Sequence, residues 1–360
     1  MTLLGDTLAE LTLALLKIPS ETGSEGPIAE SVLRRMETTT FGPRVLRHGN
    51  AVLTLPVADH RPVVALLGHL DTVPARQDGP PRREGNVIVG CGASDMKGAL
   101  AVMLALAETL DPDSMWAQPM FVFYDREEGP YVENGLGPLL ERFPETFARI
   151  RLGICMEPTS NAVEIGCLGT LHAHLTFHGQ RCHSARPWEG KNAIQEAGSL
   201  LVDLAQRQPV DVWFGDLLYR EVLSATMAFA TGTRNVIPDV FALNLNYRFA
   251  PGKSLETAYQ DVLDFVAGRA EVEFSDPCPS GPACLDNPLL KRFLTLSNVI
   301  VQAKQAWTDV ARLGVHGIDA INFGPGDGKF AHQRNEQAPV DALEDAYHLL
   351  HRFFVEEFIA

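Results

Sequence analysis

A histidine and an aspartate near residue 70 have the spacing of a metal ligand and its supporting acid. His69 and Asp71 lie two positions apart, so their side chains face the same side of an extended chain. Asp71 can then hold one ring nitrogen of His69 while the other nitrogen binds a metal ion, which fixes the histidine tautomer. Such a pair is by itself commonly a satisfied polar contact, and its meaning depends on the residues that join it.

Two adjacent glutamates, Glu127 and Glu128, follow an apolar segment. Neighbouring like charges cost free energy there unless a cation neutralises them. In extended backbone the two side chains point apart, so only one of them can bind a given ion directly. We expect Glu128 to coordinate a metal and Glu127 to stay off it as the base that takes a proton from water. The alternative is a solvated strand end.

Three further residues complete a set of metal donors. Asp95 lies in the glycine-rich segment Gly90–Gly98, before a helix rich in alanine and leucine, where a helix cap is the alternative. Glu157 follows another apolar run, and His332 ends a glycine-rich loop. If Asp95 bridges two zinc ions, each ion receives one histidine, one terminal carboxylate and the shared aspartate, with a position left for water. The segment Gly90–Gly98 lacks GxGxxG and a GK[ST] ending, which argues against a nucleotide-binding protein.

These polar residues follow four short apolar runs that are typical of buried parallel strands, with helices between them. The runs are Val63–Leu67, Met120–Tyr124, Leu152–Met156 and Ala320–Phe323. In an open α/β sheet the ligand crevice lies beyond the carboxyl ends of the strands. The clusters after the four runs are therefore expected to meet in one site.

The pattern changes between about Thr170 and Cys284, where alternating strands and helical segments predict a βαββαβ layer with one solvated face. The expected elements are strands at 171–177, 224–231 and 240–249 and helices at 193–206 and 255–267. A turn rich in proline and glycine follows at Asp276–Pro282, after which the first pattern resumes. We predict a catalytic domain of residues 1–168 and 285–360 with an inserted domain of residues 169–284.

The composition limits the partners of the chain. It has 360 residues, 46% of them hydrophobic and 21% charged, which excludes a disordered or fibrous protein. Its net charge of -15 argues against nucleic-acid and membrane partners. The six cysteines form no CxxC pair, and residues 1–19 lack a basic leader, so we expect an amphipathic N-terminal helix and a cytoplasmic protein with reduced thiols.

The motifs GHLDTVP, GASDMKGALA, REEGP, MEPT, CHSARP, NVIPD and GPGD, with the later AH, are similar to the zinc-dependent aminoacylase and desuccinylase family of metallohydrolases. The resemblance spans nearly the whole chain. It implies a zinc-peptidase-like catalytic domain with a central mixed, mostly parallel sheet, and an inserted ferredoxin-like α+β lid or dimerisation domain.

The resemblance also implies a role for each metal donor. His69, Asp95 and Glu157 would hold one Zn²⁺, and Asp95, Glu128 and His332 the other, with cobalt as an alternative metal. Glu127 would be the general base, with Asp71 behind His69. The peptide Asp95–Met96 would be cis. The chain would form a homodimer through the inserted domain, and His183 of one subunit would polarise the substrate carbonyl in the other.

Within the family, the amino-acid sequence of this chain most resembles those of succinyl-diaminopimelate desuccinylases of the actinobacterial type. Their substrate carries three carboxylates and one free amine, for which Arg248 and Asn235 are the matched binding candidates, joined by Gly326 and Arg186. Alternatives within the family are another deacylase of N-acyl amino acids, such as acetylornithine deacetylase, or a dipeptidase. The alternative outside it is a non-catalytic zinc-binding dimeric protein.

Overall fold

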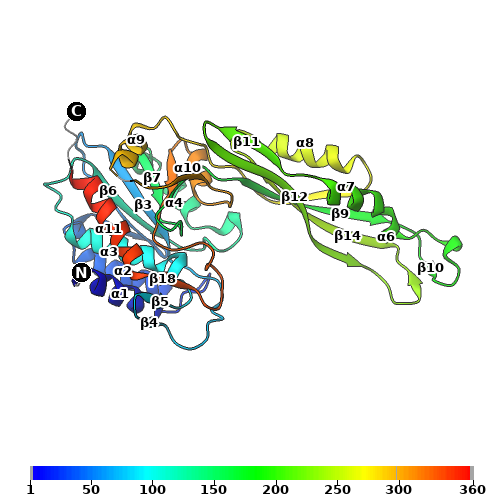
Figure 1. The fold of residues 1–360 in the computed structure, drawn as a ribbon, viewed down its shortest axis with the longest axis horizontal. Coiled ribbons are helices and arrows are strands. Elements are labelled where there is room, and N and C mark those ends of the chain that lie inside the picture. The colour runs from blue at the N-terminus through cyan, green and yellow to red at the C-terminus, as the bar shows by residue number, and fades with distance from the viewer. Residues whose placement is uncertain (1–2, 297, 357–360) are drawn as a thin grey trace. The chain divides into compact units, whose positions relative to one another are not determined.

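A computed structural model of the chain describes residues 3–296 and 298–356, which belong to two compact units (Figure 1). The first unit comprises residues 1–166, 283–302 and 308–360, and the second comprises 167–282 and 303–307. The predicted domain boundaries, after residues 168 and 284, each lie two residues beyond the main divisions at 166 and 282. The catalytic and lid functions that we assigned to the units stay predictions. Residues 1–2, 297 and 357–360 lie outside the described residues.

The first unit is built on an eight-stranded mixed sheet with the strand order β1-β2-β6-β3-β7-β17-β8-β16. Its strands are β1 (Val45–His48), β2 (Ala51–Thr54), β3 (Val63–His69), β6 (Gln118–Tyr124), β7 (Ile150–Cys155), β8 (Val163–Ile165), β16 (Val301–Ala303) and β17 (Ala320–Asn322). A three-stranded sheet is made of β4 (Arg82–Glu84), β5 (Val87–Val89) and β18 (Gln337–Pro339), in the order β18-β5-β4.

The four apolar runs of the sequence form the centre of the large sheet, as predicted. Strand β3 pairs in parallel with β6 on one side and with β7 on the other, and β17 pairs in parallel with β7. Every residue of β3 and of β6 is buried, because helices cover both faces of the sheet. The carboxyl ends of the four strands therefore lie along one edge of the sheet.

Helices of the first unit are α1 (Leu3–Leu16), α2 (Gly26–Glu37), α3 (Gly98–Thr109), α4 (Leu136–Arg142), α5 (Pro144–Phe147), α9 (Pro288–Thr295), α10 (Val310–Val315) and α11 (Val340–Val355), with short turns η1 (Gly42–Arg44), η2 (Ala93–Lys97) and η3 (Tyr131–Glu133). Helices α1, α2, α3 and α11 gather on one side of the sheet (Figure 1). Helix α3 packs closely there, since a Cβ at Gly68 would lie 2.7 Å from Leu100.

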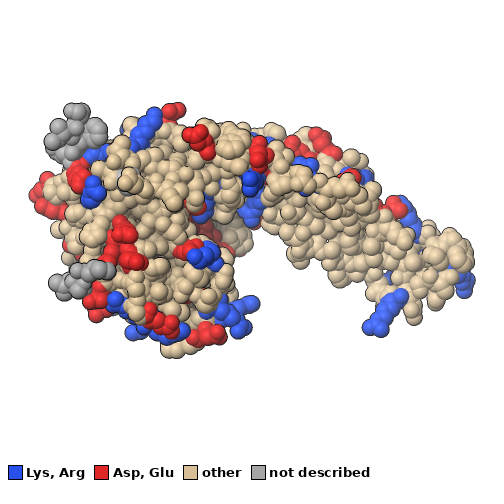
Figure 2. All heavy atoms as spheres, viewed as in Figure 1, with Lys and Arg blue, Asp and Glu red and all other residues tan. Residues whose placement is uncertain are grey.

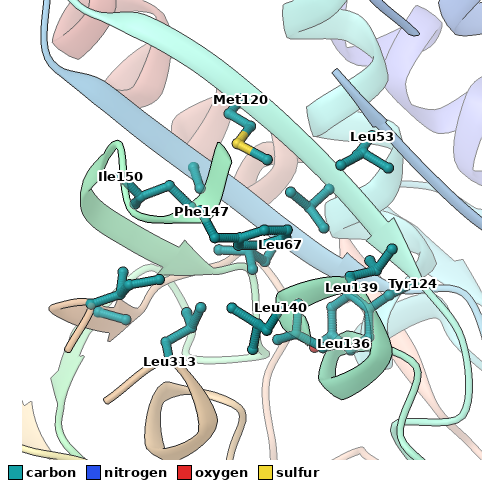
Figure 3. Close-up of a cluster of buried hydrophobic side chains, with 14 of the residues drawn as sticks. Leu53, Leu67, Met120, Tyr124, Leu136, Leu139, Leu140, Phe147, Ile150 and Leu313 are labelled. Atoms are coloured by element: carbon teal, nitrogen blue, oxygen red, sulfur yellow. The ribbon is translucent and has the colours of Figure 1, made fainter. Parts of the chain in front are cut away.

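The opposite face of the sheet packs against α4, α5 and α10. Figure 3 shows Leu67, Met120 and Tyr124 of the strands meeting Leu140 and Phe147 of the helices. These side chains are almost completely buried, and burial of a large apolar side chain stabilises a fold by about 1.5–3 kcal/mol. The two apolar layers hold the central strands, and with them the polar residues that follow each strand.

The second unit contains a five-stranded antiparallel sheet with the order β11-β12-β14-β9-β15. Its strands are β9 (Gly169–His178), β11 (Val210–Phe214), β12 (Leu217–Ala230), β14 (Val240–Phe249) and β15 (Glu271–Cys278), and a separate pair joins β10 (Cys182–His183) to β13 (Val236–Ile237). Its helices are η4 (Pro187–Glu189), α6 (Ala193–Glu196), α7 (Gly198–Gln206) and α8 (Leu255–Val266).

The predicted βαββαβ order is present in the second unit with additions. Strand β11 was missed because it is short and largely exposed, and it adds a fifth strand beside the first half of β12. The helix predicted at 193–206 is interrupted at Ala197 into α6 and α7. One face of the sheet packs against the helices, as the alternating burial along β9 indicates.

One face of the molecule carries charges of both signs, and the cysteines form no disulfide. The face in Figure 2 carries small groups of basic and acidic side chains beside one another. All six cysteines are free thiols, as expected. Within the described residues, no helix is both long enough and apolar enough to cross a membrane.

Candidate metal centre

His69 is the last residue of strand β3, and its ring contacts the backbone two residues further along the chain. Its Nδ1 lies 3.0 Å from the main-chain oxygen of Asp71 and 3.5 Å from the carboxylate atom Oδ1 of Asp71. The main-chain oxygen is therefore the nearer acceptor, whereas the sequence pattern had predicted the carboxylate. Burial opposes protonation of the ring, but the hydrogen bonds of Asp71 and Asp95 hold the pKa of His69 well above its ordinary value. The second nitrogen, Nε2, faces the centre.

Asp95 presents one carboxylate oxygen to each of the two histidines. Its Oδ1 lies 3.0 Å from Nε2 of His69, and its Oδ2 lies 3.6 Å from Nε2 of His332. Burial would raise the pKa of Asp95, yet the hydrogen bonds with His332 and His69 outweigh burial and lower it. The peptide Asp95–Met96 is cis, as predicted. A carboxylate with its two oxygens aimed at separate histidines has the orientation that a bridging ligand needs.

The remaining donors join the same centre in two groups. His69, Asp95 and Glu157 form one group, and Asp95, Glu128 and His332 form the other, and in each group the donor atoms lie within 4.8 Å of one another. Glu128 lies 2.9 Å from Nε2 of His332. The carboxylates of Asp95 and Glu128 raise the pKa of His332 to about 10, so a metal ion would have to displace a proton there. These groups have the same members as the two predicted ligand sets.

Glu127 and Glu128 lie in a turn, not in extended backbone, and this corrects the expectation that they point apart. Arg126 before them has a φ of 58°, in the left-handed region. The carboxylate of Asp71 accepts the backbone N–H of Glu127 at Oδ1 and that of Glu128 at Oδ2, both at 3.0 Å. Donor atoms of both glutamates consequently lie within 4.8 Å of His69 and of each other. Asp71 thus positions the glutamate pair.

Glu127 has the electrostatic surroundings of a base. Burial raises its pKa well above the ordinary value, against the attraction of His69 and with the repulsion of Glu157, Asp309 and Glu128. A carboxylate with a raised pKa accepts a proton more readily at neutral pH than an ordinary glutamate does.

Comparison with known proteins identifies the family of this chain. The model of peptidase family M20/M25/M40 matches residues 65–356, which is most of the chain. The chain belongs to peptidase family M20/M25/M40. A protein of Mycobacterium tuberculosis provisionally named succinyl-diaminopimelate desuccinylase is 40% identical over 354 residues, covering 97% of this chain and 98% of that protein. The succinyl-diaminopimelate desuccinylase of Corynebacterium glutamicum is 36% identical over 365 residues, covering 98% and 97%.

Solved structures share the fold of this M20/M25/M40 chain. The aminopeptidase PepT of Bacillus cereus superimposes with a TM-score of 0.77 at 16% identity, covering 97% of this chain and 98% of that one. The YXEP protein of Bacillus subtilis, described as a dinuclear metal-binding peptidase of the M20 family, has a TM-score of 0.70 at 15% identity and covers 97% of each chain. The zinc-peptidase-like α/β fold expected from the sequence is thereby confirmed.

Glu336 supports the M20 centre and was missed in the sequence. Its buried carboxylate accepts the backbone N–H groups of Gly92, Ser94 and Asp95 at 2.9, 3.0 and 2.9 Å. Burial raises the pKa of Glu336 to about 7 in spite of these three hydrogen bonds. An acidic residue just before strand β18 gives no sequence signal of contacts with residues more than 240 positions away. Glu336 fixes the loop that carries Asp95.

A hydrogen-bond network around Asp309, which the sequence did not indicate, supports the turn that carries Glu127 and Glu128. Asp309 is fully buried and accepts hydrogen bonds from the Tyr124 hydroxyl at 2.8 Å, from the Asn134 amide at 2.8 Å and from Nε of Arg312 at 3.0 Å. Tyr124 is the last residue of strand β6, and Asn134 lies a few residues beyond Glu128. The network therefore holds both ends of the loop that contains Glu127 and Glu128.

The second unit contains His183, which was predicted to be catalytic, and three predicted substrate-binding residues. His183 is exposed, and its Nδ1 accepts the backbone N–H of Ala185 at 3.0 Å. Arg186 is exposed and pairs with Glu189 at 3.5 Å. The main-chain oxygen of Asn235 accepts the N–H of Ser184 at 3.0 Å. Their roles toward substrate stay predictions.

Arg248, the fourth of these residues, and Gly326 in the first unit have local structural partners. Nε of Arg248 donates to the Asn246 side chain at 3.0 Å, and burial lowers the pKa of the guanidinium. Gly326 approaches the metal loop so closely that a Cβ would lie 2.2 Å from the main-chain oxygen of Ser94. This packing accounts for glycine at position 326, and its contact with substrate stays a prediction.

Proposed function

We propose that the chain is a two-zinc amide hydrolase that removes the succinyl group from N-succinyl-L,L-2,6-diaminopimelate, with release of L,L-diaminopimelate and succinate. The chemistry is supported by one observation above all: two groups of metal donors share Asp95 and lie beside Glu127. The substrate is supported by the likeness of almost the whole chain to two relatives that carry this enzyme's name.

The donor set fits zinc. Imidazole nitrogens and carboxylate oxygens are the usual ligands of catalytic zinc, which keeps a coordination position open for water or substrate. His69 and Glu157 would complete one site and Glu128 and His332 the other, with Asp95 common to both. The same donors suit cobalt, so the choice of metal belongs to the proposal.

Zinc held by these residues would supply a Lewis acid that lowers the pKa of the attacking water and polarises the amide carbonyl. Glu127 accepts a proton from the attacking water at a carboxylate oxygen and later gives it to the nitrogen of the leaving amine. The C–N bond breaks, the new C–O bond becomes part of succinate, and one water is consumed. Asp71 keeps Glu127 in place through the backbone hydrogen bond at 3.0 Å.

A substrate panel tests this function. Zinc-loaded protein is expected to hydrolyse N-succinyl-L,L-diaminopimelate with a kcat/KM at least about 100-fold above that for N-acetylornithine or for dipeptides, because polar groups built for one substrate are left unpaired by another. Metal-stripped protein is the control and should be inactive until zinc returns. Faster turnover of acetylornithine or of a dipeptide would assign another deacylase or a dipeptidase, and no turnover of any substrate would favour a non-catalytic zinc protein.

The proposal includes a homodimer formed through the second unit. Strand β12 pairs with β11 only as far as Glu221, while its later residues Met227 and Phe229 are 72% and 68% exposed. On the neighbouring helices Ile194 and Val202 are also exposed. Met227 and Phe229 line one pocket together, and exposed apolar side chains that lie beside one another are typical of a protein contact. A second copy of the chain is the occupant that the proposed function calls for.

Sedimentation equilibrium tests the homodimer. The wild type is expected to be a dimer, and Met227→Lys to shift it toward monomer by at least about tenfold in Kd, since a charge would be buried at the contact. Val132→Lys is the matched control, because Val132 is 84% exposed but lies in the first unit. A monomeric wild type, or equal dimerisation of wild type and Met227→Lys, would refute the contact.

A further inference from the structure

A small pocket opens beside His332 in the first unit. Its volume is about 200 Å³. Its lining combines apolar, neutral polar and cationic side chains from three loops: Val73, Pro74, Arg76, Cys91, His332 and Gln333. Because His332 belongs to one group of metal donors, a ligand in this pocket would lie next to the metal centre. The pocket is therefore placed to receive one end of a substrate whose scissile bond is held at that centre.

The walls of the pocket suit a short aliphatic group. Val73 and Pro74 supply apolar surface. Burial, with the nearby charge of Glu336, raises the pKa of the Cys91 thiol to about 11, so the thiol is neutral at physiological pH and acts as a small apolar group. The amide of Gln333 donates to the main-chain oxygen of Lys329. Arg76 supplies the permanent positive charge of the pocket.

Arg76 differs from the arginines that follow it in the chain. Arg82 pairs with Glu84 at 2.6 Å, and Arg83 pairs with Asp6 at 2.7 Å. The guanidinium of Arg76 has no hydrogen-bond or ion-pair partner within residues 3–296 and 298–356, although acidic residues outnumber basic ones by 45 to 30 in the sequence. A planar guanidinium binds a carboxylate through two parallel hydrogen bonds. Arg76 is thus available to a carboxylate ligand.

We infer that Arg76 binds the terminal carboxylate of the substrate's acyl group, with the acyl methylenes against Val73 and Pro74. This inference rests on the proposed function. The proposed substrate has two ends that such a pocket could receive. The distal diaminopimelate end carries an ammonium beside its carboxylate, and Arg76 would repel that ammonium. The succinyl end is a pure anion on two methylenes, and it matches both the charge of Arg76 and the apolar walls.

A thermodynamic cycle between protein and substrate tests the assignment. Arg76→Gln is expected to lower kcat/KM for the N-succinyl substrate about 10- to 100-fold, the range for loss of a charge-assisted hydrogen bond. On N-acetyl-L,L-diaminopimelate, which lacks the acyl carboxylate, the same variant should differ from wild type by less than about twofold, because no partner is lost. Arg76→Lys should restore part of the lost activity. Arg83→Gln is the matched control and should leave both substrates unaffected.

Succinate binding provides a readout that does not depend on turnover. Calorimetric titration of zinc-loaded protein with succinate is expected to give a Kd that Arg76→Gln weakens about tenfold or more, while the affinity for butyrate stays unchanged. Equal losses on the succinyl and acetyl substrates, or an unchanged succinate Kd, would overturn the role of Arg76 and leave the proposed function standing. If wild type fails to hydrolyse the succinyl substrate, the proposed function is overturned, and the succinate titration alone decides the role of Arg76.

Discussion

Glu127→Gln is expected to lower kcat on the N-succinyl substrate by about 10²- to 10⁴-fold, the usual contribution of a general base, while two metal ions per subunit are retained. Glutamine keeps the size of the side chain and cannot accept the proton of water. The backbone N–H of Glu127, which donates to Asp71 at 3.0 Å, is untouched by the substitution, so the turn should keep its shape. The loss of activity should therefore come from the missing proton acceptor and not from a change in the fold.

Elemental analysis of metal content, combined with steady-state kinetics, separates a base from a ligand at position 127. This distinction matters because a carboxylate oxygen of Glu127 lies within 4.8 Å of donor atoms of His69 and Glu128, close enough to join them around an ion. Glu133→Gln is a matched control, since Glu133 is exposed, lies in the same loop and pairs only weakly with Arg126 at 3.4 Å. Loss of one metal ion in Glu127→Gln would identify a ligand, and activity within tenfold of wild type would remove Glu127 as the base.

The position of the site could be predicted because it follows from strand topology. Continuous apolar runs such as Val63–Leu67 and Met120–Tyr124 are typical of strands buried on both faces, and parallel strands bring their carboxyl ends to one edge. His69 directly ends β3, and Glu157 follows β7 by two residues. Residues so close to the end of a central strand have little freedom to lie elsewhere.

The supporting contacts could not be predicted because they use backbone groups as partners. The spacing assigned Asp71 to the His69 ring, and the Asp71 carboxylate does lie 3.5 Å from Nδ1 of His69. The same carboxylate also accepts the N–H groups of Glu127 and Glu128, which the spacing did not indicate. That contact depends on the left-handed conformation of Arg126, for which arginine is not a characteristic residue. Within residues 3–296 and 298–356, the carboxylate of Glu336 likewise accepts hydrogen bonds from main-chain N–H groups alone, and main-chain donors have no signature in the sequence.

Glu336→Ala is expected to unfold at a lower temperature than the wild type and to bind zinc at least about tenfold more weakly. The substitution leaves three backbone N–H groups without their acceptor, and each unsatisfied buried donor costs about 1–3 kcal/mol. The loop at residues 92–95 would rearrange so that its N–H groups bind water. Asp95 would then lose the orientation in which its oxygens lie 3.0 Å from His69 and 3.6 Å from His332. Calorimetry with zinc and thermal unfolding without it measure the two effects.

Glu336→Gln separates the hydrogen bonds of the carboxylate from its charge. One oxygen, Oε1, accepts both Ser94 and Asp95, whereas Oε2 accepts Gly92. The glutamine oxygen can keep the first two contacts, and its amide group would face the N–H of Gly92 and lose the third. We therefore expect the glutamine variant to lie between wild type and Glu336→Ala in both zinc affinity and thermal stability, with Glu141→Ala, an exposed glutamate, as the control. If Glu336→Ala binds zinc as wild type does, the loop holds Asp95 without Glu336, and the three contacts contribute to folding alone.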